Sequence, residues 1–212
     1  MAYENEDQQV EALKKWWQEN WKALVAGLGL GVGAIVGWEA WSSHKLEVAG
    51  EASRLYEELD QALTASDTAT ADEIAGKLKT DYAGTPYAAL AAMELASHLV
   101  ETEDLEAAQE RLNWVVQRSG DEGLRHVARL RRARVLWSMS RVDEALALLK
   151  VKDSGDFAAL YAELRGDINY STGNRSAARS EYEQAMAELP EGAANRDLLQ
   201  RKLDDLADVV KS

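Results

Sequence analysis

The chain has 212 residues, a formal net charge of −13 and no cysteine. The missing cysteine excludes disulfide and thiolate chemistry, and the acidic balance argues against nucleic-acid binding, because basic residues that neutralise phosphates supply most non-specific affinity. The acidic excess falls mainly after residue 41, where about 170 residues remain, enough for one domain with its own core.

The first feature along the chain is an apolar, glycine-rich stretch, ALVAGLGLGVGAIVGW, from Ala23 to Trp38. Gly29-x-Gly31-x-x-Ala34 fits the loose dinucleotide-binding fingerprint, but that fingerprint needs a strand before it and a βαβ pattern around it. The preceding residues, WWQENWK, do not resemble a buried strand. The match therefore gives no reason to expect a nucleotide cofactor.

A retained membrane span explains the stretch better than a cleaved signal peptide does. A helix over residues 21–41 is about 30 Å long, which matches the hydrocarbon core of a bilayer. Indole rings favour the headgroup level, and tryptophans stand at both ends of the stretch: Trp16, Trp17, Trp21, Trp38 and Trp41. A signal peptide would have a short basic start and a small-residue cleavage site, whereas this chain starts with a long acidic segment. A buried helix of a soluble domain is the remaining alternative, because the uninterrupted apolar run is short.

The glycines of this span predict a helix-packing face. Gly29, Gly33 and Gly37 recur every four residues, and Gly27 and Gly31 form a second pair. Such G-x-x-x-G spacing lets two transmembrane backbones approach closely. The alternative is that a membrane helix merely tolerates small residues at these positions.

The basic residues that flank the span give a slight bias for its orientation. They are Lys14, Lys15 and Lys22 before it, and Lys45 and Arg54 after it. The positive-inside rule then favours a cytoplasmic N-terminus. We therefore expect a cytoplasmic, amphipathic tail over residues 1–20, a span over residues 21–41, and a domain outside the cytoplasm over residues 42–212.

The rest of the chain predicts an all-α fold. Alanine, leucine, glutamate and arginine recur at helical spacing, and short segments with turn chemistry separate the periodic stretches. The predicted helices cover residues 43–65, 68–80, 85–101, 104–118, 121–139, 141–152, 156–171, 174–188 and 192–209.

These helices pair into a repeat of about 34 residues, which is typical of the tetratricopeptide fold, an α-solenoid of helix pairs. A small residue on each first helix is followed twelve residues later by an alanine on the second: Ala96 and Ala108, Ala133 and Ala145, Gly166 and Ala178. Antiparallel helices cross closely where both carry small side chains. The third unit keeps a glycine at the turn, Gly173, whereas Glu103 and Ser140 replace it in the first two.

Stacked pairs form a superhelix whose first helices line a concave face. Aromatic residues and arginine commonly anchor protein interfaces. The residues that we expect to form a partner-binding groove on this face are Met93, Ser97, Arg134, Trp137, Asp167 and Tyr170. A core position is the alternative for Trp137.

An arginine-rich segment, RHVARLRRAR, spans residues 125–134. Arg125, Arg129 and Arg132 fall on one helical face, and the preceding helix carries Glu106 and Glu110. This arrangement predicts interhelical ion pairs, with a docking patch for an acidic partner as the alternative.

No residue pattern indicates catalysis. Glu94 and His98 have the i, i+4 spacing of a metal-binding pair, but no third ligand accompanies them. No nucleophile has a recognisable base partner. We therefore expect a protein that is not an enzyme, with no catalytic residue, no metal site and no cofactor.

Four segments also carry a family resemblance: YENEDQQVEALKKWWQENWKAL, GVGAIVGWEAWSSH, YAGTPYAALAAMELA and LRGDINYSTGNRSAAR. Together they resemble the YfgM family of ancillary SecYEG translocon subunits in the inner membrane of Gram-negative bacteria. The resemblance implies a cytoplasmic tail, a single span and a periplasmic tetratricopeptide domain. It also implies a complex with the SecYEG translocon and the periplasmic chaperone PpiD, and a role in passing secreted or outer-membrane proteins onward.

Two functional hypotheses follow. In the first, the protein is a membrane-anchored protein-binding module at the translocon that hands secretory proteins, bound while still unfolded, to periplasmic chaperones. In the second, it is a scaffold or regulatory subunit that holds one fixed signalling partner through the same repeats.

Overall fold

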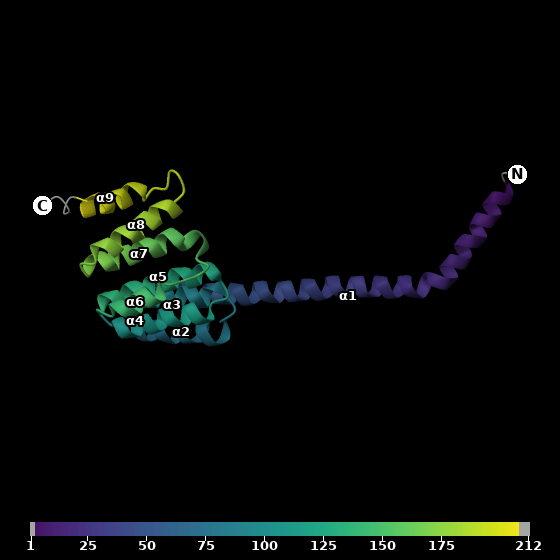
Figure 1. Ribbon diagram of the computed structural model, residues 1–212. Coiled ribbons are helices and arrows are strands. Elements are labelled where there is room, and N and C mark those ends of the chain that lie inside the picture. The colour runs from purple at the N-terminus through teal and green to yellow at the C-terminus, as the bar shows by residue number, and fades with distance from the viewer. Residues whose placement is uncertain (1–2, 208–212) are drawn as a thin grey trace. The chain divides into compact units, whose positions relative to one another are not determined.

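The computed structural model describes residues 3–207, and this part of the chain is helical without a strand, as the sequence predicts. Figure 1 colours the helices by residue number, from purple at the N-terminus to yellow at the C-terminus. They are α1 (Tyr3–Thr64), α2 (Thr68–Asp81), α3 (Pro86–Glu101), α4 (Leu105–Arg118), α5 (Glu122–Ser138), α6 (Val142–Leu148), the short 3₁₀ helix η1 (Gly155–Phe157), α7 (Ala158–Ser171), α8 (Arg175–Glu188) and α9 (Arg196–Ala207).

The span and the first predicted repeat helix form one continuous helix, α1, rather than two. No proline interrupts it, and helix propagation needs only one hydrogen bond per added residue. The chain nevertheless divides into two compact units, residues 1–50 and 51–212. The last turns of α1 therefore belong to the repeat domain.

Two helices are shorter than predicted, and a glycine with left-handed backbone lies in the chain outside each of them. The helix expected over residues 141–152 ends at Leu148, and Gly155 in the following segment has φ +48°. The helix expected over residues 192–209 begins only at Arg196, after Gly192 with φ +84°. Its predicted last residues, 208 and 209, lie outside the described part of the chain.

The turn inside each helix pair has the same geometry in four units. Ser66, Glu103, Ser140 and Gly173 all adopt left-handed backbone, with φ between 59° and 79°. In every case the next residue donates its backbone N–H to a carbonyl in the last turn of the preceding helix, at 2.8–2.9 Å. This is the Schellman motif that normally selects glycine. Glu103 and Ser140 thus occupy the turn position that the repeat pattern predicts for them. Since Ser66 makes the same turn, the end of α1 and α2 together form a further repeat unit.

Glycine at residue 103 or 140 should stabilise the domain. A side chain in left-handed backbone costs about 1–2 kcal/mol, part of which the greater freedom of glycine in the unfolded chain offsets. Glu103→Gly and Ser140→Gly should therefore each raise the free energy of unfolding by about 0.5–1 kcal/mol. Chemical unfolding of the detergent-solubilised protein, followed by circular dichroism, measures this change. Glu110→Gly, at an exposed site inside α4, should instead cost about 1 kcal/mol; equal effects at all three sites would contradict the assignment.

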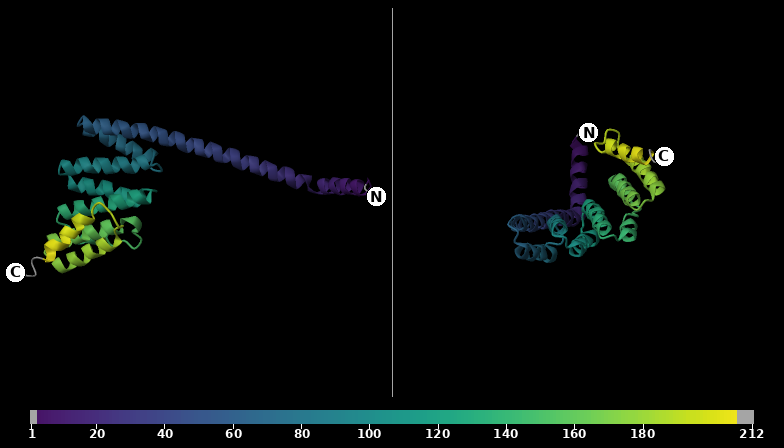
Figure 2. Two further views of the ribbon diagram at one scale, coloured as in Figure 1. Left: turned by 90° about the horizontal axis from the view of Figure 1, so that it is seen from above. Right: turned by 90° about the vertical axis from the view of Figure 1, so that its left-hand side faces the viewer.

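Successive helices pack against one another, and the first helices of neighbouring units also touch directly, α3 with α5 and α5 with α7. The right-hand view of Figure 2 shows the helices of the repeat domain following one another along a curve. Because the first helices contact across units, they lie on the inner side of that curve. The face expected to bind partners is thus built from α3, α5 and α7.

The core between α5 and α7 contains one titratable side chain without a charge partner in direct contact. His126 is 6% exposed, its Nδ1 lies 2.9 Å from the hydroxyl oxygen of Tyr161, and its ring stacks on Phe157. Glu122 from the same helix is 4.0 Å away and exposed, while Arg129 and Arg125 repel a positive imidazole. Burial lowers the pKa of His126, the arginines lower it further, and Glu122 opposes them only in part.

The lowered pKa makes the stability of the domain depend on pH. The pKa of His126 is lower in the folded protein than in the unfolded chain, where a free imidazole has a pKa of about 6.5. The unfolded chain therefore binds a proton at this residue more readily than the folded protein does. The stabilisation is complete above the pKa of the unfolded chain and is lost as the pH falls below it. Unfolding midpoints measured from neutral to mildly acidic pH should therefore decrease, and His126→Gln should reduce the decrease. An identical pH profile for the variant would refute the assignment.

Candidate protein-binding face

Three of the six residues predicted for the groove meet in one hollow on the inner face, of about 330 Å³. Met93 is 4% exposed and forms part of its apolar floor, whereas Ser97 and Arg134 are exposed at its rim. The other lining residues are Ala96, Val100, Leu112, Arg131 and Val135. We call this the α3–α5 hollow. Val100 is 41% exposed, so the hollow presents apolar surface beside two guanidinium groups.

Two more of the predicted residues, Asp167 and Tyr170, line a smaller hollow of about 160 Å³ with Tyr182, Lys202 and Asp205. Tyr170 is 46% exposed, so its ring is available to a partner. Asp167 is only partly exposed and is already engaged by its neighbours. We call this the α7–α9 hollow.

The α7–α9 hollow is held together by a polar network. Lys202 of α9 donates to Glu163 and to Asp167, both at 2.7 Å, and the Tyr182 hydroxyl donates to Asp167 at 2.8 Å. Burial and the bond to Asp167 raise the pKa of Tyr182. Burial alone would lower the pKa of Lys202, but its bonds to Asp167 and Glu163 outweigh this effect and raise it. The lysine therefore stays charged and fastens the last helix to α7.

Trp137 lines neither hollow. It is partly buried against the core cluster between α5 and α7, and its indole N–H donates to the Ser171 hydroxyl at 3.0 Å. This bond links the ends of two consecutive first helices. The structure thus favours the packing alternative for Trp137, and leaves its role in partner binding as a prediction.

All six residues predicted for repeat packing are buried. Ala96 and Ala108 lie in one core cluster, and Ala133 and Ala145 lie in the next. Ala178 shares a third cluster with Tyr182. The closest approach is at Gly166, where a Cβ atom would collide with the ring of Tyr182.

The arginine-rich segment makes different contacts from those predicted. Arg125 donates to the backbone oxygen of Ser119 at 2.9 Å, and Arg129 donates to the Tyr161 hydroxyl at 3.4 Å. Arg132 donates to Gln109 at 3.1 Å. The predicted ion pairs with Glu106 and Glu110 are therefore wrong for these three arginines.

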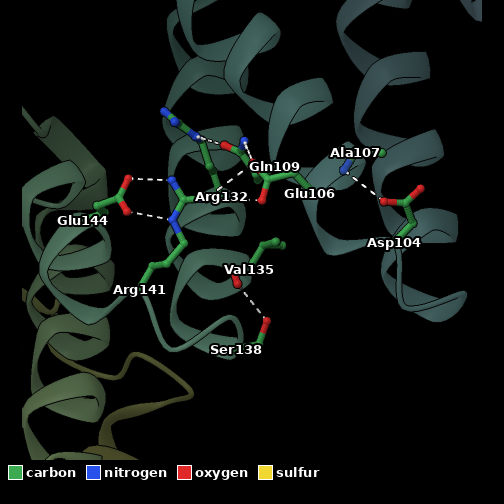
Figure 3. A network of polar contacts seen from close by, with 9 residues as sticks. All are labelled: Asp104, Glu106, Ala107, Gln109, Arg132, Val135, Ser138, Arg141 and Glu144. Carbon is green, nitrogen blue, oxygen red and sulfur yellow. Dashed lines mark hydrogen bonds and ion pairs between the residues drawn. The ribbon is translucent and has the colours of Figure 1, made fainter.

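Another arginine takes the place beside Glu106. Figure 3 shows Arg141 between Glu106 of α4 and Glu144 of α6, with nitrogen–oxygen distances of 3.3 and 2.6 Å. Arg141 occupies the position before α6 where other units carry a capping Asp or Asn, and its backbone oxygen accepts from Ala145. It can reach both carboxylates because it lies at the turn between α5 and α6. Figure 3 also shows Arg132 reaching Gln109 instead.

The glycines of α1 face open space in the described structure. A Cβ atom at Gly27, Gly29, Gly31, Gly33 or Gly37 would meet no atom within 4 Å. Among the described helices only α1 is long and apolar enough to cross a membrane, and none of its most apolar window is buried. The ring centroids of Trp38 and Trp41 are 5.2 Å apart, and the Lys45 ammonium lies 4.1 Å from the Trp41 ring. The span is thus uncovered, as a lipid-facing helix requires.

Comparison with known proteins gives the family. The tetratricopeptide repeat-like domain matches residues 14–208. The chain is 38% identical to the ancillary SecYEG translocon subunit of Escherichia coli strain K12, covering 97% of this chain and 98% of that protein. It is 33% identical to the protein of the same name from Haemophilus influenzae, over 87% of this chain and 91% of the other. The chain belongs to the ancillary SecYEG translocon subunit family.

Membership of this family confirms the resemblance to the YfgM family and the tetratricopeptide fold. An ancillary translocon subunit with an uncovered apolar helix near its N-terminus also fits an inner-membrane protein. Tetratricopeptide-like repeats are not an enzymatic fold, and the expectation that the protein is not an enzyme stays a prediction.

The sequence analysis missed two residues of the candidate face. Arg131 stands three positions before Arg134, which places both on one side of α5, and this spacing could have identified it. Lys202 falls in the helix predicted over residues 192–209, and no local pattern indicates that it reaches Glu163 and Asp167, more than 30 residues earlier in the chain. A third hollow, of about 500 Å³, lies on α2 and α4 around Lys79, Arg111 and Trp114.

Proposed function

We propose that this protein is a membrane-anchored, protein-binding subunit of the SecYEG translocon. The observation that carries the proposal is the covalent connection, within α1, of an uncovered apolar helix to a repeat domain with open hollows on its inner face. The names of the relatives, ancillary SecYEG translocon subunits, support the SecYEG translocon as the complex to which it belongs. In this role, the domain binds a segment of a secretory protein or of the periplasmic chaperone PpiD and helps to pass the client onward.

In this proposal residues 1–20 form a cytoplasmic tail, residues 21–41 cross the inner membrane, and residues 42–212 lie in the periplasm. The lysine bias and the family resemblance support this orientation. Protease added to cells with a permeabilised outer membrane should then digest the repeat domain. Protection of the domain until the inner membrane is also lysed would contradict the orientation.

Site-specific photo-crosslinking tests the proposed binding face. A crosslinker at Ser97 and another at Tyr170 sample the two hollows, and Ser180, exposed on α8, provides the control site. Adducts with unfolded secretory chains or with PpiD from the first two sites, but not from Ser180, support the proposal. One fixed folded signalling partner would support the scaffold alternative, and no adduct at either hollow would refute both.

The glycines of the span give a separate prediction. Replacing Gly29, Gly33 and Gly37 with leucine should preserve membrane insertion, because leucine favours the bilayer centre by about 0.3–0.6 kcal/mol per residue. Recovery of the membrane partners from detergent extracts should fall, because the new side chains hold the helices apart.

The control for this variant changes Leu24, Leu28 and Val32 to other aliphatic residues, which should have little effect on partner recovery. Insertion is measured by carbonate extraction and recovery by affinity purification with mass spectrometry. Wild-type recovery by the triple leucine variant would show that the span is only an anchor.

A further inference from the structure

The five arginines of the segment 125–134 divide into two groups. Arg125, Arg129 and Arg132 are each hydrogen-bonded inside the domain. Arg131 and Arg134 are exposed and form no ion pair or hydrogen bond with any residue that the structure describes. Their guanidinium donors are therefore available to a partner, and the two stand on one side of α5. Both line the α3–α5 hollow.

The α3–α5 hollow combines this positive charge with apolar surface. Its floor is made of the buried side chains Met93, Ala96, Leu112 and Val135. No carboxylate is among its described lining residues, although the protein as a whole carries a net charge of −13. Two arginines with no carboxylate beside them form a local positive site, and such a site favours a partner group of negative charge.

We propose that the α3–α5 hollow binds a partner segment in which a carboxylate side chain stands next to an apolar one. Arg131 and Arg134 are three residues apart on α5, so their planar donors can hold one Asp or Glu side chain from two directions. The neighbouring apolar side chain of the partner enters the hollow and covers Met93 and Val100. A basic segment is rejected by charge repulsion. This inference rests on the proposed function, because it names the chemistry that the binding face recognises.

A charge-swap experiment tests the inference on the full-length protein in nanodiscs of zwitterionic lipid. The probe is a fluorescently labelled helical peptide of glutamate and leucine, and a second probe has lysine in place of every glutamate. The variant is Arg131→Glu with Arg134→Glu. The matched control is Arg118→Glu with Arg175→Glu, which changes the net charge equally at two exposed sites outside the hollow. Fluorescence anisotropy measures binding, with empty nanodiscs as the blank.

The variant at the hollow should bind the acidic peptide about tenfold more weakly or worse than the wild type, and should bind the lysine peptide more tightly. The control should stay within about twofold of the wild type for both peptides, apart from the common effect of salt. Misfolding of the hollow variant would not make it bind the lysine peptide more tightly. This gain therefore distinguishes the loss of a specific site from damage to the whole domain.

Three results would overturn the inference: no binding of the acidic peptide to the wild type, no change in the hollow variant, or the same change in the control variant. Each is distinguishable from failure of the proposed function. If Ser97 still crosslinks to partners while the charge swap has no effect, the face binds proteins by other chemistry. If Ser97 and Tyr170 give no adducts, the proposed function fails as well.

Discussion

Replacing Gly166 with alanine should destabilise the repeat domain by about 1–3 kcal/mol, although alanine is the better helix former. The added Cβ atom would occupy the space of the Tyr182 ring. Tyr182 is 2% exposed and its hydroxyl donates to Asp167, so moving the ring away would break this bond. The strain must therefore separate α7 from α8, the helices of the most complete repeat unit.

Gly76→Ala is the matched control for this substitution. Gly76 also lies inside a helix, α2, but a Cβ atom there would meet nothing within 4 Å. This variant should be more stable than the wild type by up to about 1 kcal/mol. Denaturant unfolding followed by circular dichroism measures both changes. A stabilising effect of Gly166→Ala would show that the two helices are not held at this distance.

Replacing Lys202 with methionine should lower the free energy of unfolding by about 1–3 kcal/mol, because it leaves two partly buried carboxylates close together without a counter-charge. Glu163 and Asp167 are 17% and 28% exposed, and the lysine is 24% exposed. This partial exposure to water keeps the expected loss below that of a fully buried ion pair. Limited proteolysis should cut the chain near α9 before the other helices, because Lys202 joins that helix to α7.

An exposed ion pair on the neighbouring helix provides the comparison. Arg179 and Glu183 lie 3.0 Å apart and are 50% and 58% exposed. Arg179→Met should cost no more than about 0.5 kcal/mol. Adding Glu163→Gln to Lys202→Met should recover part of the lost stability, because one of the two facing charges is removed. Equal losses from Lys202→Met and Arg179→Met would mean that the α9 contact is marginal.

The local features of the fold were predictable because they depend on short stretches of chain. Helical periodicity needs only neighbouring residues, and the caps at Asp67, Asp104 and Asn174 act within three residues of themselves. The repeat position of the left-handed turns at Glu103 and Ser140 followed from comparing units within the same sequence. The family resemblance rested on the same kind of local segments.

The length of the membrane-proximal helix was less predictable. Residues 21–41 were expected as a span and residues 43–65 as a separate helix, yet α1 runs through both. Nothing in the local sequence between them stops a helix, and the chain changes from apolar to polar residues without a break in α1. Because the backbone hydrogen bonds of a helix form within the helix itself, α1 can continue from apolar into polar sequence without ending.

The sequence by itself therefore determined the α-helical repeat, its turns and its apolar span, because periodicity, capping and hydrophobicity are encoded over a few residues. Only the tertiary structure decided which charged groups are paired. Glu106 pairs with Arg141 rather than with the arginines of α5, and Lys202 binds to α7. Arg131 and Arg134 have no partner among the described residues and lie beside an apolar floor. Long side chains on a helix can reach several neighbours, so their partners depend on the rotation and spacing of helices that are distant in sequence.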